Sequence, residues 1–253
     1  MEVEDYENRI MCGDCLAILK TMPDNCIDLI VTSPPYNKGN KKPPSNTTWS
    51  GKKNMKIDYG VYSDNMPEDK YQKRQVDVLN ECLRVLKPKG SLFYNHKPRR
   101  INRDMIFPTA WLQSFRINQL IIWNRKNSPQ INNFCYLPTT EHVYWIKKSD
   151  HPKFYRKRCM YRGEIWDMPL SKDKEHPAPF PIELPTNCIN ACTDIRDIVL
   201  DPYVGCGTTA IASVMTNRRF IGIDISKHYC KVSNDRIRNL KESNTQQMGR
   251  WGL

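Results

Sequence analysis

Short apolar runs bounded by polar turns recur along most of the chain, and segments with helical spacing separate several of them. Helical spacing of the apolar residues in 76–86 predicts a helix that ends at the turn 87–90, and further helices are expected from about Thr208 and over 226–240. The alternation is typical of an α/β protein whose mostly parallel sheet is covered by helices on both faces. The apolar runs predict strands at residues 9–12, 27–31, 91–94, 119–123, 141–146, 198–201 and 220–224.

Two polar, basic segments interrupt this pattern. Residues 37–59 are rich in Lys, Asn, Pro, Gly and Ser without apolar periodicity, so we expect an inserted mobile basic loop. Residues 147–175 mix aromatic with basic side chains, which suits contacts with phosphates and bases. The tail 241–253 is polar enough to be disordered. The sequence thus predicts one domain with halves at 1–146 and 176–240, joined by the short segment 147–175.

The charge of the chain points to a partner rather than to a fold. Its 39 Lys and Arg against 27 Asp and Glu give a formal net charge of +12. A polyanion such as nucleic acid is the usual partner of such a field, although a lysine-rich solvated surface has the same composition. No run approaches the roughly 20 apolar residues that a membrane span needs, and the acidic start lacks the features of a signal peptide. We therefore expect a soluble intracellular protein without a membrane partner.

The 10 cysteines are expected to be reduced thiols, because disulfide frameworks belong to secreted chains. Cys12 and Cys15 have the spacing of a metal-binding or redox pair. However, Cys188 and Cys192 are spaced differently, and no nearby His completes a set of four ligands. We therefore expect no metal.

A glycine-containing turn, DPYVGCGTT at 201–209, lies where a strand gives way to a helix. Gly205 and Gly207 allow the backbone to approach a ligand closely. RFIGID follows at a suitable interval, and Asp224 at its end can accept hydrogen bonds from both ribose hydroxyls of a nucleoside. No Gly-Lys-Ser/Thr is present to hold a triphosphate. A nucleoside without phosphates, such as S-adenosylmethionine, therefore fits better than ATP.

A second motif, TSPPYN at 32–37, ends an apolar strand near the N-terminus. Pro34 and Pro35 stiffen the backbone and lack N–H donors, so the carbonyls nearby are fixed acceptors. Ser33 adds a hydroxyl acceptor, and Tyr36 offers the face of an aromatic ring. A planar amine could be held there, whereas the simpler alternative is an ordinary turn at the end of a strand.

These motifs resemble the catalytic and cofactor motifs of the amino-group DNA methyltransferases, which methylate N4 of cytosine or N6 of adenine. The resemblance continues through CGDCLAILKTMPDNCIDLIVTSPPYN, VLKPKGSLFYNHK, HPAPFPIELP and VLDPYVGCGTTAIAS, which together span most of the chain. The catalytic motif comes first, as in the permuted beta arrangement of that family. The resemblance implies a circularly permuted, Rossmann-like methyltransferase fold dependent on S-adenosylmethionine. Its seven-stranded sheet would bring both loops to the carboxyl ends of adjacent strands.

The resemblance also implies roles for individual residues. Ser33 and the Pro34 carbonyl would accept hydrogen bonds from the amine, and Tyr36 would stack on a base flipped out of the duplex. Asp14 would contact the adenine ring of the cofactor, and Phe180 would pack near its methionine end. The catalytic motif is Ser33, Pro34, Pro35 and Tyr36, and the expected cofactor residues are Asp14, Phe180, Asp201, Pro202, Gly205, Gly207, Thr208, Thr209 and Asp224.

In this family Asp at the position of Ser33 is usual for adenine and Ser for cytosine, so we predict methylation of cytosine N4 in DNA. Adenine N6 is the alternative, followed by RNA or protein-amide methylation and a catalytically silent nucleic-acid-binding subunit. The protein would act wherever its DNA lies, and the resemblance leaves a homodimer open. Target recognition is expected in 147–175, with help from 37–59. The basic residues expected to contact DNA are Lys38, Lys41, Lys42, Lys52, Lys53, Arg156, Lys157 and Arg158.

Overall fold

A computed structural model of the protein describes residues 2–37, 64–101, 104–128, 135–170 and 180–250. Its main sheet has eight strands in the order β1-β10-β9-β2-β3-β7-β6-β8, and β4 and β5 form a separate hairpin. In the main sheet, β7 pairs antiparallel with both of its neighbours, and the other pairings are parallel. The strands are β1 (Arg9–Cys12), β2 (Ile27–Thr32), β3 (Leu86–His96), β4 (Arg99–Ile101), β5 (Asp104–Ile106), β6 (Ile117–Asn124), β7 (Thr140–Lys147), β8 (Ile165–Asp167), β9 (Ile198–Asp201) and β10 (Arg219–Asp224).

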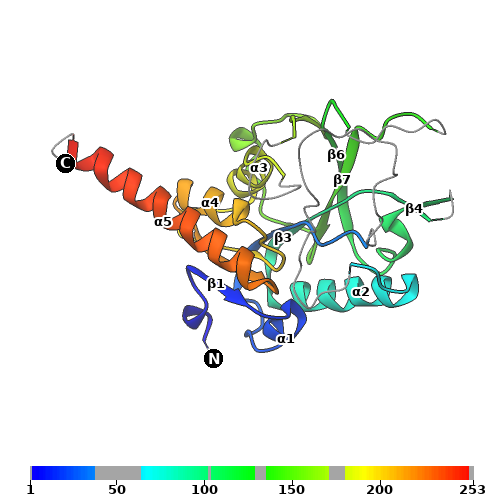
Figure 1. The fold of residues 1–253 in the computed structure, drawn as a ribbon, viewed down its shortest axis with the longest axis horizontal. Coiled ribbons are helices and arrows are strands. Elements are labelled where there is room, and N and C mark those ends of the chain that lie inside the picture. Colours follow the sequence, from blue (N-terminus) through cyan, green and yellow to red (C-terminus); the bar gives the residue numbers. More distant parts are fainter. Residues whose placement is uncertain (1, 38–63, 102–103, 129–134, 171–179, 251–253) are drawn as a thin grey trace.

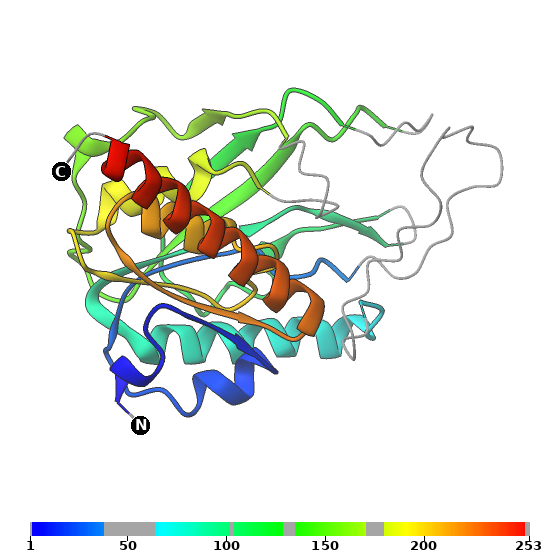
Figure 2. The ribbon, with the colours of Figure 1, turned by 60° about the vertical axis from the view of Figure 1, so that its left-hand side comes forward.

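Helices cover both faces of the main sheet, which confirms the expected α/β class. One face is covered by α1 (Cys15–Leu19) and α2 (Glu68–Val85). The other is covered by α3 (Glu183–Cys192), α4 (Thr208–Met215) and α5 (Lys227–Arg250), as Figures 1 and 2 show. Three short 3₁₀ helices, η1 (Val3–Asp5), η2 (Pro108–Ala110) and η3 (Arg156–Arg158), lie in the connections. Within the described ranges, no helix combines the length and apolar character needed to cross a membrane.

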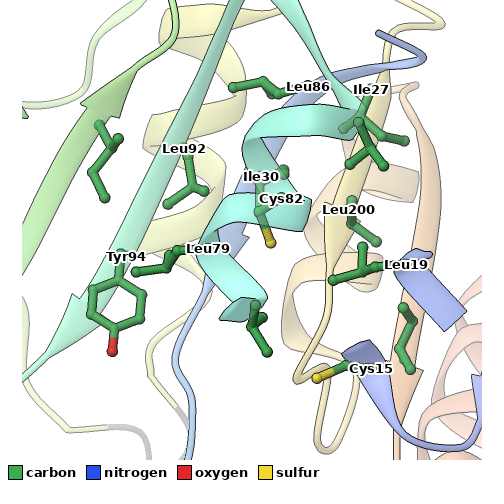
Figure 3. Close-up of a cluster of buried hydrophobic side chains, with 14 of the residues drawn as sticks. Cys15, Leu19, Ile27, Ile30, Leu79, Cys82, Leu86, Leu92, Tyr94 and Leu200 are labelled. Atoms are coloured by element: carbon green, nitrogen blue, oxygen red, sulfur yellow. The ribbon is translucent and has the colours of Figure 1, made fainter. Parts of the chain in front are cut away.

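The central strands are buried on both faces, as expected for parallel strands between two layers of helices. All six residues of β2 are buried. Ile30 of β2 packs with Leu92 and Leu200 of the adjacent strands against α2 (Figure 3), whereas Leu29 and Val31 pack in the cluster under α3. The carboxyl end of β2 is therefore fixed in position from both sides.

The structure corrects three expectations about the fold. The main sheet has eight strands rather than seven, because β8 adds to the outer edge of β6. Its three residues are too few to produce a periodic signal in the sequence. Helix α3 was not expected from its sequence, which carries Pro185 in its first turn, where proline is tolerated. The predicted disorder of 241–253 is wrong for residues 241–250, which continue α5.

The sheet order explains the permutation. Strand β9, which leads into the glycine turn, lies in the middle of the sheet, and β10 and β1 follow on one side of it. Strands β2 and β3 continue on its other side. The N-terminal strand β1 thus sits beside the penultimate element of the chain, so one continuous sheet is built from both halves of the sequence. The expected insertion at 37–59 lies outside the described residues from 38 onward.

Candidate active site

The two sequence motifs meet at the carboxyl ends of adjacent strands. Strands β2 and β9 pair in parallel with Leu29 opposite Val199 and Ile30 opposite Leu200. TSPPYN leaves the end of β2, and DPYVGCGTT begins with the last residue of β9. The expected adjacency of the two loops is therefore confirmed. Ligands of open α/β sheets bind at this kind of edge.

Asp201 joins the two loops through its side chain. It is 2% exposed, and its Oδ1 accepts hydrogen bonds from Thr32 Oγ1 at 2.8 Å and from the Tyr203 amide at 3.0 Å. Its Oδ2 accepts one from Thr209 Oγ1 at 2.7 Å. Asp201 and Thr209, both expected at the cofactor, thus fix the first turn of α4 to the residue that precedes Ser33. Sequence reasoning missed Thr32, which completes this connection.

Burial raises the pKa of the Asp201 carboxyl to about 6, although its three hydrogen bonds act in the opposite direction. The pKa of Asp in an unfolded chain is about 3.9. Between about pH 4 and 6 the folded state therefore holds a proton that the unfolded state has released. The free energy of unfolding therefore falls as the pH rises through this window. Across the window this change in the free energy of unfolding totals about 3 kcal/mol, and we expect Asp201→Asn to remove it. Urea unfolding of both proteins across the window measures it, and parallel stability curves would contradict it.

The glycine turn has the backbone conformation that its sequence predicts. Gly205 and Gly207 have φ values of 51° and 87°, in the left-handed region that favours glycine. A Cβ on Gly207 would also lie 3.1 Å from the Cβ and Oγ of Ser233 on α5. The turn therefore depends on glycine for its conformation and for its close approach to α5.

Replacing Gly207 with alanine is expected to lower the free energy of unfolding by about 1–3 kcal/mol, from left-handed strain and the contact with Ser233. Gly163→Ala is the matched control, because no heavy atom lies within 4 Å of a Cβ built there. Chemical denaturation of both variants is the measurement. Equal stabilities of the two variants would show that the turn tolerates a side chain.

Asp224 ends β10 beside the glycine turn. Its Oδ2 accepts a hydrogen bond from the Gly205 amide at 3.0 Å and its Oδ1 one from the Ser226 amide at 2.8 Å. A carboxylate has about four acceptor sites, so capacity for two hydroxyl donors remains. Burial raises the pKa of this carboxyl. Asp224 therefore combines the place and the acceptor capacity expected of a residue that holds a ribose.

The remaining expected cofactor residues lie around this edge in different roles. Asp14 follows β1, caps α1 through the Ala17 amide at 3.0 Å and pairs with Arg74 at 2.5 Å. Pro202 and Thr208 are buried at the two ends of the glycine turn. Phe180 packs against the apolar cluster under α3. Asp14 thus has two structural partners that the sequence did not indicate.

Two backbone carbonyls of the catalytic motif differ in their hydrogen bonds. The Pro35 carbonyl accepts a hydrogen bond from the Tyr71 hydroxyl at 2.8 Å. The Pro34 carbonyl, by contrast, accepts none from any described residue. Tyr36 is half-buried, and its ring centroid lies 4.5 Å from that of His96. The motif is therefore anchored from α2 and β3, while the acceptor next to Ser33 stays available.

The Tyr36 hydroxyl lies at the centre of a polar network. It lies 2.9 Å from Ser33 Oγ, donates to Glu141 Oε2 at 2.9 Å and accepts from Asn95 Nδ2 at 3.0 Å. Arg125 forms a buried ion pair with Glu141 at 3.3 Å. Sequence reasoning missed Asn95, Glu141 and Arg125. Polar residues at the catalytic ends of otherwise apolar strands were the signal that could have found the first two.

Of the eight basic residues expected at DNA, the structure describes three, and these lie away from this edge. The five lysines of the expected basic loop lie outside the described residues. Arg156, Lys157 and Arg158 form η3, next to Tyr155, whose amide donates to the Ala191 carbonyl at the end of α3. Arg158 pairs with Asp194 at 3.0 Å, just before β9 begins. This part of 147–175 therefore lies at the amino ends of the strands, opposite the catalytic motif.

The Cys12 and Cys15 pair has no metal-site character in the structure. None of the 10 cysteines, all of which the structure describes, forms a disulfide. Burial raises the pKa of the Cys15 thiol to about 11, which keeps it protonated and a poor metal ligand. Among the described residues, no group of three or more His, Cys, Asp or Glu side chains could hold a metal ion.

Comparison with known proteins identifies the family. The family model described as DNA methylase, of the N6 and N4 type, matches residues 27–235. The chain belongs to this DNA methylase family. The methylase is 31% identical to the type II methyltransferase M.HpaI of Haemophilus parainfluenzae, over 91% of its own length and 74% of the relative's. It is 29% identical to M.BglII of Bacillus subtilis, over 91% of its length and 69% of the relative's.

Solved structures share the methylase fold. PvuII DNA methyltransferase (cytosine-N4-specific) superposes with a TM-score of 0.71 at 18% identity, covering 89% of this chain and 84% of that one. A putative DNA modification methylase of Thermus thermophilus, solved with S-adenosyl-L-methionine, gives a TM-score of 0.65 at 24% identity, covering 90% and 92%. The methylase therefore has the fold of S-adenosylmethionine-dependent methyltransferases. As a member of its family, it methylates an exocyclic amine in DNA, N4 of cytosine or N6 of adenine, with that cofactor.

Proposed function

We propose that the methylase transfers a methyl group from S-adenosylmethionine to N4 of cytosine in DNA. The observation that carries this proposal is Ser33, an uncharged acceptor beside the Pro34 carbonyl, which accepts no hydrogen bond from any described residue. The family resemblance links Ser at this position to cytosine and Asp to adenine. Asp201 supports the proposal further, because it holds the catalytic and cofactor loops together at one edge.

Ser33 and Pro34 act on the amine by accepting its hydrogen bonds. The lone pair of an exocyclic amine is delocalised into the base, so the nitrogen is a poor nucleophile. Acceptors for both of its hydrogens favour a pyramidal nitrogen whose lone pair can attack in line. Because a base in a duplex is out of reach, it must flip out, at a cost of a few kcal/mol. Stacking on Tyr36 offsets part of that cost.

The glycine turn and Asp224 suit a nucleoside that carries no phosphates. Asp224 has acceptor capacity for two hydroxyl groups, the Gly205–Gly207 turn brings the backbone close, and no lysine stands in the turn to hold phosphate. When bound, S-adenosylmethionine supplies a methyl group made electrophilic by its sulfonium. Asp14 and Phe180 would contact its adenine and methionine ends.

Adenine N6 is the second candidate, and one relative keeps it open. YhdJ of Escherichia coli, named a DNA adenine methyltransferase, is 28% identical over 90% of this chain. The PvuII enzyme is named cytosine-N4-specific and matches at the level of the fold. The names of the similar proteins thus include both bases, and the cytosine assignment rests on Ser33.

Identification of the methylated nucleoside tests the proposal. The purified protein is incubated with S-adenosylmethionine and unmethylated genomic DNA, and the DNA is digested and analysed by mass spectrometry. N4-methyldeoxycytidine is expected. N6-methyldeoxyadenosine would refute the cytosine assignment and leave DNA amino methylation standing. Methylation of RNA or protein in parallel reactions, with none in DNA, would overturn the proposed substrate.

A further inference from the structure

Hydrogen bonds connect three side chains in sequence to the proposed target site, and Asn95 Nδ2 contacts all three. Glu141 stands on β7, and Tyr36 and Ser33 belong to the loop that follows β2. The Tyr36 hydroxyl lies 2.9 Å from Glu141 Oε2 and 2.9 Å from Ser33 Oγ. The proposed function uses the ring of Tyr36 and the oxygen of Ser33. It assigns no role to the Tyr36 hydroxyl or to Glu141.

The acceptor at the start of the chain is fixed by its surroundings. Glu141 is 7% exposed and pairs with Arg125, which is 6% exposed, at 3.3 Å. As the partner of a buried arginine it is a carboxylate, and a carboxylate can only accept hydrogen bonds. Asn95 Nδ2 also donates to it, at 3.0 Å. Glu141 therefore draws the single proton of the Tyr36 hydroxyl toward itself.

The remaining directions follow from proton counting. Burial, and next the charge of Glu141, raise the pKa of Tyr36 well above its usual value, so the phenol keeps its proton at neutral pH. With that proton donated to Glu141, the Tyr36 oxygen can only accept from Ser33. The one proton of Ser33 then points toward Tyr36. Asn95 Nδ2 donates to Ser33 Oγ at 3.3 Å, which leaves one lone pair of that oxygen for the amine.

We propose that Glu141, acting through the Tyr36 hydroxyl, is a positioning residue that makes Ser33 an acceptor for the exocyclic amine of the target base. This inference rests on the proposed function. A serine needs such a partner, because a freely rotating hydroxyl can also point its proton at the amine. An aspartate in its place would accept without help. The hydroxyl of Tyr36 thus has a role separate from stacking.

Tyr36→Phe tests the proposal, because it keeps the aromatic ring and removes the hydroxyl. Under single-turnover conditions we expect the rate of methyl transfer to fall about 10- to 100-fold. Binding of DNA and of S-adenosylmethionine is expected to stay within about twofold, since neither uses the hydroxyl directly. If stacking is the whole role of Tyr36, the variant will transfer methyl groups at the wild-type rate, and the proposal fails.

Glu141→Gln and the double variant test the direction of the chain. A Gln can present its amide N–H to Tyr36 and reverse the hydrogen bonds, so we expect a loss similar to that of Tyr36→Phe. Because both changes act through the same serine hydroxyl, the double variant should be little slower than either single one. Losses that multiply would overturn the proposal. If Glu141→Gln does not fold, the Tyr36→Phe rate alone decides.

Two variants away from the site control for lost hydrogen bonds and lost charge. Tyr6→Phe removes a buried hydroxyl that lies 2.9 Å from Thr21 Oγ1, and Glu7→Gln breaks a Glu–Arg pair with Arg219 at 2.6 Å. Both should transfer methyl groups at the wild-type rate. The wild-type protein on the same DNA separates the two proposals. Absence of transfer by the wild type refutes the proposed function, whereas an active wild type with an equally active Tyr36→Phe refutes only the role of Glu141.

Discussion

Replacing Ser33 with alanine is expected to slow methyl transfer at least about 100-fold while S-adenosylmethionine binds as tightly as before. The change removes one of the two proposed acceptors for the target amine and leaves the glycine turn untouched. The side chain of Ser33 contacts Tyr36 and Asn95. The hydrogen bonds of the glycine turn and Asp224 therefore remain in the variant. Single-turnover transfer to DNA and calorimetric titration of the cofactor measure the two properties on one sample.

Ser243→Ala is the control for this experiment. Ser243 is exposed on α5 and bonds only to the Asn239 carbonyl among the described residues. We expect this variant to transfer methyl groups at the wild-type rate. Transfer by Ser33→Ala within about threefold of that rate would remove Ser33 from the chemistry, because losing an oriented hydrogen bond to the reacting group costs more.

Replacing Asp224 with asparagine is expected to weaken binding of S-adenosylmethionine by about 100-fold, equivalent to about 3 kcal/mol. Hydrogen bonds to a charged acceptor contribute about 1.5–3 kcal/mol each, and the variant loses the charge. In the wild type, the amides of Gly205 and Ser226 both donate to the carboxylate. An Asn in its place would direct an N–H at one of these two donors. Calorimetric titration with the cofactor gives the dissociation constant directly.

Asp235→Asn provides the matched control for charge. Asp235 lies on α5 in an exposed pair with Arg238 at 2.5 Å, and among the described residues its side chain makes no hydrogen bond to the glycine turn. Its loss should leave the cofactor affinity unchanged, and thermal unfolding shows whether either variant is destabilised. A folded Asp224→Asn protein that binds the cofactor as tightly as Asp235→Asn would show that the ribose is held elsewhere.

The parts of the site that lie on short local patterns were predictable from the sequence. Strand β9 and the start of α4 fall where the apolar run and the glycine turn place them, and β10 follows with Asp224 at its end. The positive φ angles of Gly205 and Gly207 follow from the same turn. Each of these features depends on neighbouring residues, which is why periodicity and turn chemistry were sufficient.

Features that depend on distant pairing were not predictable. Glu141 reaches Tyr36 because β7 runs antiparallel beside β3, a pairing that no local pattern encodes. The position of Arg156–Arg158 at the amino ends of the strands depends on how Tyr155 docks onto the end of α3. The composition of that segment favours contacts with DNA, but composition does not show at which end of the strands its basic and aromatic residues lie.

Asp201 connects the catalytic motif to the glycine turn. Asp201 holds Thr32, which precedes Ser33, and Thr209 of α4 on one buried carboxylate. The proposed acceptors for the amine and the proposed cofactor residues are therefore connected through Asp201. Such preorganisation is what a reaction without a covalent enzyme intermediate requires, because positioning supplies most of its rate.

A crystal structure of the protein with S-adenosylhomocysteine and a duplex carrying the methylated sequence would show directly how the target base is held. We expect a flipped cytosine stacked on Tyr36, with N4 within about 3.2 Å of both Ser33 Oγ and the Pro34 carbonyl oxygen. A flipped base whose amine lies away from both acceptors would contradict it.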